Sequence, residues 1–385
     1  MKKPKIPLFN LTVSPEAVRE VTATLKSGWL TTGSKADRLE QEIGELLGVR
    51  HVAAVSSATS GMLLALQALG VSKGSEVITT PFTFVATTEV ILHCGAKPVF
   101  VDIDPETLTI GPALIEKKIN RKTACILAVD LAGFPCDYKA LRTVGKKHLL
   151  PILSDSSHAL ASAVNDKSIA QLANIAVYSL HATKNLTSGE GGIVASTNKQ
   201  LIERVRLLSR HAMTANAFQR QKAGKAAYDV SALGSKANLS DIHASVALGQ
   251  MRQFAKRQKQ RETIAARYAK NLAVYSDCLS LPFLKKGFNH SWHLYIIRLK
   301  LDSLKISRDQ FIYEMSIHGI ECGIHYRPIY EFSFYRALGY SGKNLPNTAQ
   351  AGRSVLSLPM YPDLTLAQVD TVCDALSAVI AKYRR

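Results

Sequence analysis

Lys184 is the residue of this sequence that is best suited to covalent chemistry. It lies in a polar turn between two apolar segments, 175–180 and 193–197, whose β-branched residues predict strands. A lysine in a turn is ordinarily a solvated surface residue. One that is held between buried strands can lose its charge and form a Schiff base with a carbonyl compound. The hydroxyls and glycines around it would also let the turn bind an anion and approach a flat ligand closely.

Three further positions could bind a ligand, and each has a simpler interpretation. The turn 56–61 precedes a predicted apolar helix, 62–69. Its backbone N–H groups and the hydroxyls of Thr59 and Ser60 could hold a phosphate, or could merely cap the helix. Asp155 follows an apolar strand and could equally be a helix cap.

Histidines and phenylalanines near the predicted strand ends are open to the same doubt. His158 alone would most simply be a buried structural histidine, and for His325 a structural role is as plausible as a ligand contact. In the segment 81–87, a phenylalanine after a strand more often fills the core than covers a planar ring. Residue types alone therefore leave Phe82 and Phe84 as core candidates.

The elements that position these residues alternate between strand and helix. Helices are predicted from 15 to 27, with Ser14 as N-cap, and at 36–47, 84–93, 138–146, 199–211 and 242–251. Strands are predicted at 52–55, 76–79, 99–102, 124–129 and 151–154. This alternation indicates an α/β fold with a mostly parallel sheet covered on both faces. Ligands of such sheets bind at the carboxyl ends of the strands, where the candidate residues fall.

The pattern changes to α+β beyond about residue 251. A long basic helix (252–270) is followed by a strand (292–298), a helix (307–317), a strand (321–326) and a terminal helix (366–383). The segment 212–232 is polar and has no clear assignment. We therefore predict a large domain, 1–250, and a smaller C-terminal domain, 251–385.

Composition indicates an ordinary globular protein of about two domains. No apolar run approaches the roughly 20 residues needed to span a bilayer, and the basic N-terminus lacks the apolar core of a signal peptide. Six scattered cysteines, without zinc-type spacing, predict reduced thiols and no metal site. We therefore expect a cytoplasmic protein.

The net charge of +18 allows two interpretations. A basic face could bind nucleic acid or a membrane surface, or a basic enzyme could attract anionic substrates. A helix-turn-helix, an aromatic platform and a basic tail are all missing from the sequence, which disfavours nucleic acid. We expect small anionic substrates, with neither nucleic acid nor membrane as a partner.

The segment 179–192, SLHATKNLTSGEGG, resembles the lysine motif of the DegT/DnrJ/EryC1/StrS family. This family comprises pyridoxal-phosphate-dependent aminotransferases that act on nucleotide-linked keto sugars. Further similarity runs from GWLTTG (28–33) to LPMYP (358–362) and so covers nearly the whole chain. The resemblance implies a fold type I aminotransferase that works as a homodimer with shared active sites.

The resemblance also assigns roles to individual residues. Lys184 would hold pyridoxal phosphate as a Schiff base and then act as the base, while Asp155 would keep the ring nitrogen protonated. Phe84 would stack on the ring, and Phe82 would stay in the core. The other cofactor-binding residues would be Thr59, Ser60, His158, Ser179 and, from the neighbouring subunit, Lys236. The substrate-binding residues would be Trp29, Thr31, Thr32, His325 and Tyr326.

Three positions depart from the pattern of the family. Ser235 and Ala237 flank Lys236 where aromatic residues are usual, and Asp130 stands where histidine is more common. The departures at 235 and 237 put the packing of that loop in question. Asp130 has no explanation from the sequence.

The resemblance implies transfer of an amino group from L-glutamate to a UDP- or dTDP-linked 4-keto sugar, for a cell-surface polysaccharide or a secondary metabolite. The segments 28–33 and 55–60 favour a UDP-4-keto-pentose. Dehydration is the reaction of relatives with histidine at the lysine position, and Lys184 argues against it. Another reaction of the same cofactor remains an alternative, as does a basic binding protein without catalytic activity.

Overall fold

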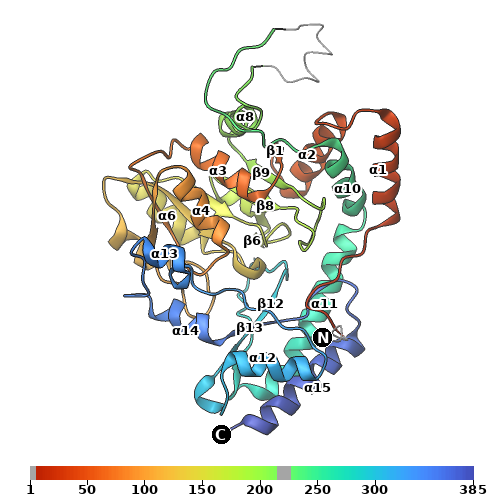
Figure 1. Cartoon of the computed structure of the whole chain (residues 1–385), viewed down its shortest axis with the longest axis vertical. Coiled ribbons are helices and arrows are strands. Elements are labelled where there is room, and N and C mark those ends of the chain that lie inside the picture. The colour runs from red at the N-terminus through yellow and green to blue at the C-terminus, as the bar shows by residue number, and fades with distance from the viewer. Residues whose placement is uncertain (1–5, 215–226) are drawn as a thin grey trace.

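The computed structural model of the chain describes residues 6–214 and 227–385, and it places a seven-stranded sheet at its centre (Figure 1). The strand order is β1-β9-β8-β5-β4-β2-β3. These strands are β1 (His51–Val55), β2 (Glu76–Thr79), β3 (Lys97–Phe100), β4 (Thr123–Val129), β5 (Ile152–Asp155), β8 (Ile175–Ser179) and β9 (Gly192–Ser196). Strands β3, β2, β4, β5 and β8 run parallel, whereas β9 is antiparallel to both of its neighbours. The predicted mostly parallel sheet is therefore confirmed.

Helices cover both faces of this sheet, as the continuous apolar strands predict. One face packs against α3 (Ala58–Ala68), α4 (Val85–His93) and α8 (Lys199–Leu208). The other packs against α2 (Ser34–Leu47), α5 (Pro112–Ile115), α6 (Tyr138–His148), α7 (Ile169–Leu172) and α10 (Asp241–Met251). Helix α1 (Pro15–Ser27) lies against α10, and Ser14 caps it as predicted. The short strands β6 (Ala163–Val164), β7 (Lys167–Ser168) and β11 (Phe288–Asn289) form a separate sheet.

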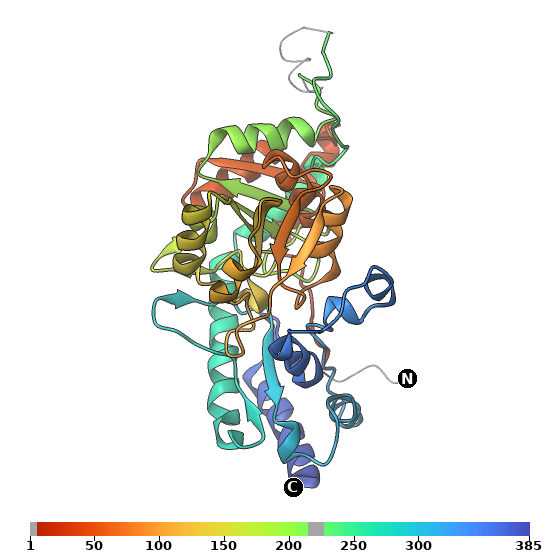
Figure 2. The same cartoon turned by 90° about the vertical axis from the view of Figure 1, so that its left-hand side faces the viewer.

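The C-terminal part has a sheet of its own, β10-β12-β13, below the main sheet in Figure 1. Its elements are α11 (Phe254–Leu272), β10 (Leu279–Ser280), β12 (Tyr295–Leu299), α12 (Arg308–Ile317), α13 (Ser333–Ala337), α14 (Pro346–Ser354), β13 (Val355–Leu358) and α15 (Leu366–Tyr383). Its apolar core joins α11, α12 and α15 to this sheet, and α11 runs beside it (Figure 2). Ile6 belongs to the same core, so the start of the described chain crosses to the C-terminal part. The division into domains at 250/251 stays a prediction.

The predicted strand 321–326 is wrong. Only Gly323 pairs there, in an isolated antiparallel bridge with Ser357 of β13. The chain then turns away, and His325 and Tyr326 enter a pocket instead of continuing a ladder. Strand β13 pairs with β12 along one edge, and on its other edge it meets this segment only through the bridge at Gly323.

Three further expectations concern the segment 212–232, membrane-spanning helices and the cysteines. The unassigned segment 212–232 lies partly outside the described residues, which stop at 214 and resume at 227. Nowhere in the described chain does a helix combine the length and the apolar character needed to cross a membrane. All six cysteines are free thiols, four of them buried.

Asp130 is explained by the structure as a buried acceptor at the end of β4. Its side chain is fully buried, and its carboxylate accepts hydrogen bonds from the backbone N–H of Cys136 (2.8 Å) and from three hydroxyls. These are Tyr138 Oη (2.9 Å), Ser154 Oγ (2.7 Å) and Ser156 Oγ (2.8 Å). Burial raises the pKa of this carboxyl, while its hydrogen bonds oppose the rise. Asp130 therefore fixes the ends of β4 and β5, which border the pocket described below.

Replacing Asp130 with alanine is expected to destabilise the protein without removing a pocket residue. The change leaves a buried N–H and three buried hydroxyls without their shared acceptor, which should cost about 2–4 kcal/mol of unfolding free energy. Urea unfolding followed by circular dichroism measures this loss. A change below about 0.5 kcal/mol, the level typical of neutral surface substitutions, would contradict this role of the carboxylate.

Candidate active site

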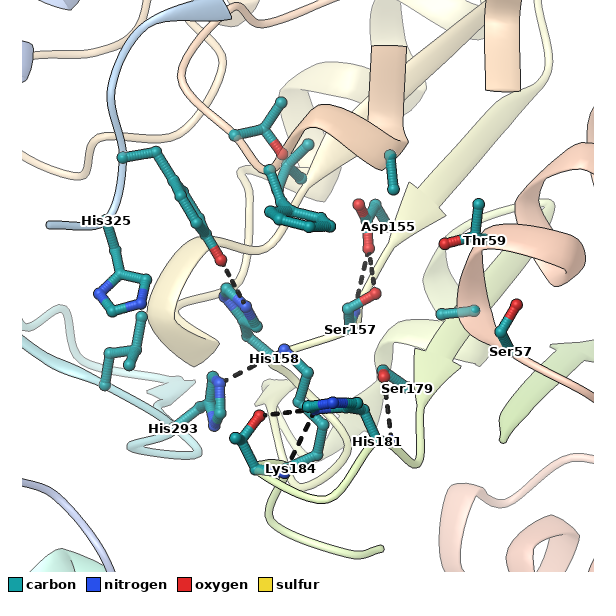
Figure 3. A pocket seen from close by; sticks show the side chains of 18 of the residues that line it. Ser57, Thr59, Asp155, Ser157, His158, Ser179, His181, Lys184, His293 and His325 are labelled. Atoms are coloured by element: carbon teal, nitrogen blue, oxygen red, sulfur yellow. Dashed lines mark hydrogen bonds between the residues drawn. The ribbon is translucent and has the colours of Figure 1, made fainter. Parts of the chain in front are cut away.

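A pocket of about 410 Å³ opens at the carboxyl ends of the parallel strands (Figure 3). Asp155 enters it from the end of β5 and Ser179 from the end of β8, because the carboxyl ends of parallel strands meet at one edge of the sheet. The N-terminus of α3, the turn that carries Lys184, and residues 325–326 form its other walls. Segments far apart in the sequence thus converge on one cavity.

The turn from β8 to β9 is closed by its own hydrogen bonds. Leu180 binds Gly191 and Ser188 through backbone bonds of 2.9 Å each, and the Thr187 hydroxyl donates to the Leu180 carbonyl (3.1 Å). Gly189 turns the chain with a φ of 82°, which glycine adopts without the steric cost that other residues bear. The closed turn holds Lys184 at the pocket instead of letting it extend into solvent.

Lys184 points into the pocket, where its Nζ lies 3.5 Å from Nε2 of His293 (Figure 3). Burial lowers the pKa of the Lys184 amine to about 8, because the charged form loses solvation, and the carboxylate of Asp155 opposes this shift. A larger share of this amine is therefore uncharged at neutral pH than for a surface lysine. An uncharged amine is the form that attacks a carbonyl group.

The lowered pKa gives a testable pH dependence. Deprotonation creates the reactive amine, so the reaction of Lys184 with an aldehyde should rise with pH and reach half its maximum near the pKa of about 8. Mass-spectrometric measurement of Lys184 labelling, against the exposed Lys199 as internal control, would show it. Identical profiles for the two lysines would contradict the desolvated environment.

Asp155 presents a fixed carboxylate at the opposite side of the pocket. Its Oδ2 accepts a hydrogen bond from the Thr87 hydroxyl (2.7 Å), and its Oδ1 accepts from the hydroxyl (2.5 Å) and N–H (3.1 Å) of Ser157. The side chain is 6% exposed. These donors hold the acid in one orientation, so that it can face a ligand nitrogen instead of capping a helix.

The start of α3 forms an anion-binding wall. The helix begins at Ala58, four residues earlier than predicted, so Thr59 lies in its first turn, and Ser57 is the N-cap that accepts from the N–H of Ser60 (3.0 Å). Ser57, Ala58 and Thr59 line the pocket together with Ser179. N–H groups of a first turn, with hydroxyls beside them, are suited to a phosphate.

Gly192 makes this arrangement possible. A Cβ atom on Gly192 would lie 2.5 Å from the backbone carbon of Ser57, so only glycine lets β9 run directly beneath the start of α3. Ser60 faces away from this role, since its hydroxyl is bonded to those of Ser56 (3.0 Å) and Ser57 (2.6 Å). The predicted contact of Ser60 with a cofactor stays a prediction.

His158 and Tyr326, which both line the pocket, form a hydrogen-bonded pair. His158 Nδ1 accepts the backbone N–H of Ala132 (3.2 Å), so in the neutral ring Nε2 carries the hydrogen and donates to Tyr326 Oη (3.2 Å). Burial, followed by the charge of Lys184, holds the pKa of His158 well below its usual range. The hydroxyl hydrogen of Tyr326 is thereby left to donate to a ligand.

The two phenylalanines lie in different surroundings, and the stacking of Phe84 on a cofactor ring stays a prediction. Phe82 is fully buried. Phe84 is 56% exposed and lines the pocket, with its ring centroid 6.1 Å from that of Tyr326. Its face is therefore free of core packing and accessible to a planar ligand.

The predicted substrate-binding residues fall into two groups. His325 lines the pocket; its Nδ1 lies 2.8 Å from Ser357 Oγ, and burial lowers its pKa to about 4. Among the described residues that line the pocket, Trp29, Thr31 and Thr32 do not appear. Thr31 and Thr32 bond instead to the segment that follows Lys236: the Thr32 hydroxyl donates to the Leu239 carbonyl (2.5 Å), and the Thr31 carbonyl accepts from the N–H of Asp241 (3.2 Å). The indole N–H of Trp29 donates to the Thr32 carbonyl (3.2 Å). Lys236 is exposed and also lies outside this pocket.

Three groups of this site were not predicted from the sequence. Thr87 and Ser157 hold Asp155, and His293 approaches Lys184. Proximity in sequence to Phe84 and Asp155 could have suggested the two hydroxyls. No local pattern distinguishes His293, which lies just before a strand of the C-terminal part and reaches Lys184 only through the fold.

The donor set fits pyridoxal phosphate. An amine that is largely desolvated, a carboxylate, a helix N-terminus with hydroxyls and an aromatic face are the groups that its aldehyde, ring nitrogen, phosphate and ring require. Lys184, Asp155, the α3 terminus and Phe84 supply them around a single cavity.

Comparison with known proteins identifies a family that matches nearly the whole chain. Residues 12–377 match the DegT/DnrJ/EryC1/StrS aminotransferase family. The chain is 34% identical to the spore coat polysaccharide biosynthesis protein SpsC of Bacillus subtilis over 371 residues, 96% of this chain and 95% of SpsC.

Solved structures agree over the same extent. The putative sugar aminotransferase Spr1654 of Streptococcus pneumoniae in its PMP-form superposes with a TM-score of 0.92 at 30% identity, covering 98% of this chain and 100% of that one. Its PLP-form gives a TM-score of 0.91. DesI, solved in the presence of its TDP-sugar product, gives 0.88 at 26% identity, covering 98% of this chain and 93% of that one.

Proposed function

Since this chain belongs to the DegT/DnrJ/EryC1/StrS aminotransferase family, we propose that it transfers an amino group from L-glutamate to a nucleotide-linked keto sugar. The protein is an aminotransferase of the fold type I class and uses pyridoxal phosphate. Its structural relatives are sugar aminotransferases. The observation that carries the proposal is the convergence of Lys184, Asp155 and the start of α3 on one cavity.

Each wall of the cavity has a separate task in this proposal. The first-turn N–H groups of α3, with Thr59 and Ser179, bind the cofactor phosphate, and Phe84 covers the ring. Asp155 holds a proton on the ring nitrogen. Pyridoxal phosphate, when bound, supplies the electron-withdrawing ring that accepts the electron pair released when a substrate carbon loses its proton.

Lys184 moves the proton. With the cofactor bound and the Lys184 amine free, its uncharged Nζ would accept a proton from the substrate carbon and would return a proton on the cofactor side. The pKa of about 8 suits a group that must both accept and release a proton near neutral pH. Tyr326, whose hydroxyl hydrogen is left free by His158, and His325 would bind the substrate, and their position in the pocket lining supports this role.

The nature of the acceptor is supported by the relatives and by charge. DesI was solved with a TDP-sugar product, and SpsC is named for spore coat polysaccharide biosynthesis. A net charge of +18 favours an anionic substrate such as a nucleotide diphosphate sugar. We propose a UDP- or dTDP-linked 4-keto sugar, with UDP-4-keto-pentose as the first candidate, and a product that enters a polysaccharide or a secondary metabolite.

Incubation with ¹⁵N-labelled L-glutamate and candidate keto sugars tests this proposal directly. We expect mass spectrometry to detect a ¹⁵N-labelled amino sugar still attached to its nucleotide, and 2-oxoglutarate as the second product. If the ¹⁵N label appears only in a free sugar, or in no sugar at all, the proposal that the acceptor is linked to a nucleotide is refuted.

We propose that the active protein is a homodimer in which Lys236 serves the neighbouring cavity. Lys236 is exposed and lies outside the pocket of its own chain. Nearby, residues 227–235 project beyond α8 at the top of Figure 1 and expose Tyr228, Val230 and Leu233 (52%, 56% and 91%). Exposed apolar side chains on a projecting segment are suited to burial against a second copy.

Mixing two inactive variants tests the shared site. In a refolded equal mixture of Lys184→Ala and Lys236→Ala chains, half of the dimers are hybrids with one intact site, so about a quarter of wild-type activity should return. Light scattering would verify that each variant is dimeric. A mixture no more active than its components would contradict the contribution of Lys236 across the interface.

We place the reaction in the cytoplasm. Six free thiols, four of them buried, are compatible with a reducing compartment. In the same proposal the large domain, 1–250, binds the cofactor and the C-terminal domain, 251–385, closes one side of the cleft with His293, His325 and Tyr326.

A further inference from the structure

His293 is a buried imidazole of the pocket that the proposed mechanism does not use. Its side chain is 7% exposed, its Nε2 lies 3.5 Å from Lys184 Nζ, and its ring packs 4.4 Å from that of His158. No carboxylate within the described residues hydrogen-bonds to it. A histidine in this position either fills space or interacts with the amine that performs the chemistry.

The hydrogen bonds of Asn185 decide which nitrogen of His293 bears the hydrogen. The Nδ2 group of Asn185 donates to the carbonyl of Ser291 (2.7 Å) and to Oε1 of Gln258 (3.3 Å). Both partners are acceptors, so Nδ2 is the amide nitrogen and Oδ1 faces His293 Nδ1 at 3.3 Å. Nδ1 therefore carries the hydrogen, and the lone pair of Nε2 faces Lys184.

The backbone of His293 is held from two sides. Its N–H donates to the carbonyl of Ala132 (3.0 Å), next to the end of β4. On the other side, the buried Arg261 of α11 donates from Nη1 to the carbonyls of Trp292 (3.0 Å) and His293 (3.4 Å). This two-sided support fixes the backbone of His293, and the contact of its Nδ1 with Asn185 then orients the ring.

The residue before His293 carries backbone strain. Trp292 has a φ of 52°, in the left-handed region that a bulky residue rarely adopts. It is kept there by a bond from its N–H to His290 Nδ1 (2.9 Å) and by stacking on the His290 ring (4.0 Å between centroids). Strain of this kind persists where the surrounding structure enforces it and is concentrated at functional sites. Here the bend delivers His293 to Lys184.

We propose that His293, oriented by Asn185, is the positioning residue that accepts a hydrogen bond from the Lys184 amine whenever this amine is free. The proposal deepens the function proposed above and rests on the role of Lys184 in it. The bond fixes the rotamer of Lys184 and directs its lone pair into the cavity, which lowers the orientational cost of the proton transfer. No covalent step is assigned to His293.

The ionisation states around Lys184 agree with this role. Burial, followed by the charge of Lys184, keeps the pKa of His293 well below its usual range, so that Nε2 stays an acceptor. The titratable groups that face the two side chains are Asp155, His158, His325 and Arg261. Asp155 alone favours the charged amine among these, and the two histidines are neutral.

Replacing His293 with leucine distinguishes a positioning role from a merely structural one, because the two roles predict pKa changes of Lys184 in opposite directions. Loss of an acceptor removes a bond that stabilises the ammonium form, so the pKa of Lys184 should fall below about 8. A loosened pocket that admits water would instead raise this pKa toward 10.5. Labelling of Lys184 by an amine reagent at a series of pH values, in the cofactor-free protein, measures the change without any substrate.

A second readout uses the cofactor-loaded protein. We expect the single-turnover rate with L-glutamate to fall about tenfold in His293→Leu, from the loss of one oriented hydrogen bond, with little change in the glutamate concentration needed for half-saturation. His293→Gln places an amide oxygen near the position of Nε2 and should restore both the pKa and the rate. His243→Leu removes a half-buried imidazole of α10 that does not line the pocket, and it should leave the pKa of Lys184 unchanged.

The proposal is overturned if the pKa of Lys184 in His293→Leu stays the same or rises, or if His293→Gln behaves like His293→Leu. These outcomes do not depend on which keto sugar is aminated. If the ¹⁵N assay yields no amino sugar but the labelling of Lys184 gives the expected pKa change, the proposed substrate is refuted and the role of His293 stands.

Discussion

Replacing Lys184 with alanine is expected to lower transamination by about 10³-fold or more, since in the proposed mechanism one change removes both the covalent anchor of the cofactor and the base that moves the proton. The fold should survive, because the side chain lies in a pocket and the turn is closed by bonds of Leu180, Thr187, Ser188 and Gly191. Steady-state kinetics of 2-oxoglutarate release measure the effect.

The matched control for this variant is Lys199→Ala. Lys199 begins α8 and its side chain is 68% exposed. The Lys199→Ala variant should retain wild-type rates, and its melting temperature should equal that of Lys184→Ala. A Lys184→Ala protein that keeps more than about a tenth of the wild-type rate would remove Lys184 from the mechanism, since general base catalysis alone contributes more than that.

Changing Asp155 to asparagine is expected to reduce the rate by about 10²–10³-fold. Asparagine has nearly the same shape and can keep bonds to Thr87 and Ser157, but it carries no charge to hold a proton on the ring nitrogen. Loss of this carboxylate should also lower the pKa of Lys184 further below about 8, because Asp155 is the group that favours the charged amine. Stopped-flow single turnovers with L-glutamate, repeated across pH, report both effects.

Asp102→Asn is the control for loss of a buried carboxylate. Asp102 is as buried as Asp155 (5% against 6% exposed) but binds Thr348 and Asn347 outside the pocket. This control can lose stability, yet its rate per folded molecule should be unchanged. Equal losses of rate in the two variants would mean that Asp155 acts on folding and not on the reaction.

Much of the fold could be predicted because its strands are short, apolar and bounded by clear caps. The predicted strand 76–79 and terminal helix 366–383 coincide with β2 and α15. Ser14 is the predicted N-cap, because its side chain accepts an N–H group of the first helical turn, whereas Ser307, predicted as the first residue of its helix, is the N-cap of α12. The failure at 321–326 has a different cause. The local pattern of that segment is compatible with a strand, but its available partner, β13, meets it only at Gly323.

The site was predictable to the extent that its residues lie at the ends of strands or in the lysine turn. Lys184, Asp155 and Ser179 reach the cavity because the carboxyl ends of β5 and β8 lie at the same edge. His293 could not be found in this way, since it meets Lys184 through a contact between segments 109 residues apart. Thr31 and Thr32 bond to the segment after Lys236, and neither they nor Trp29 line the cavity of their own chain, so their role in substrate binding stays a prediction.

An absorption spectrum of the protein loaded with pyridoxal phosphate tests the central claim most directly. We expect a near-ultraviolet to visible band that moves to shorter wavelength on addition of L-glutamate, returns on addition of a nucleotide-linked 4-keto sugar, and is altered or absent in Lys184→Ala. A protein that acquires no such band after incubation with the cofactor, or whose band ignores both substrates, would contradict the account of Lys184 and its cavity.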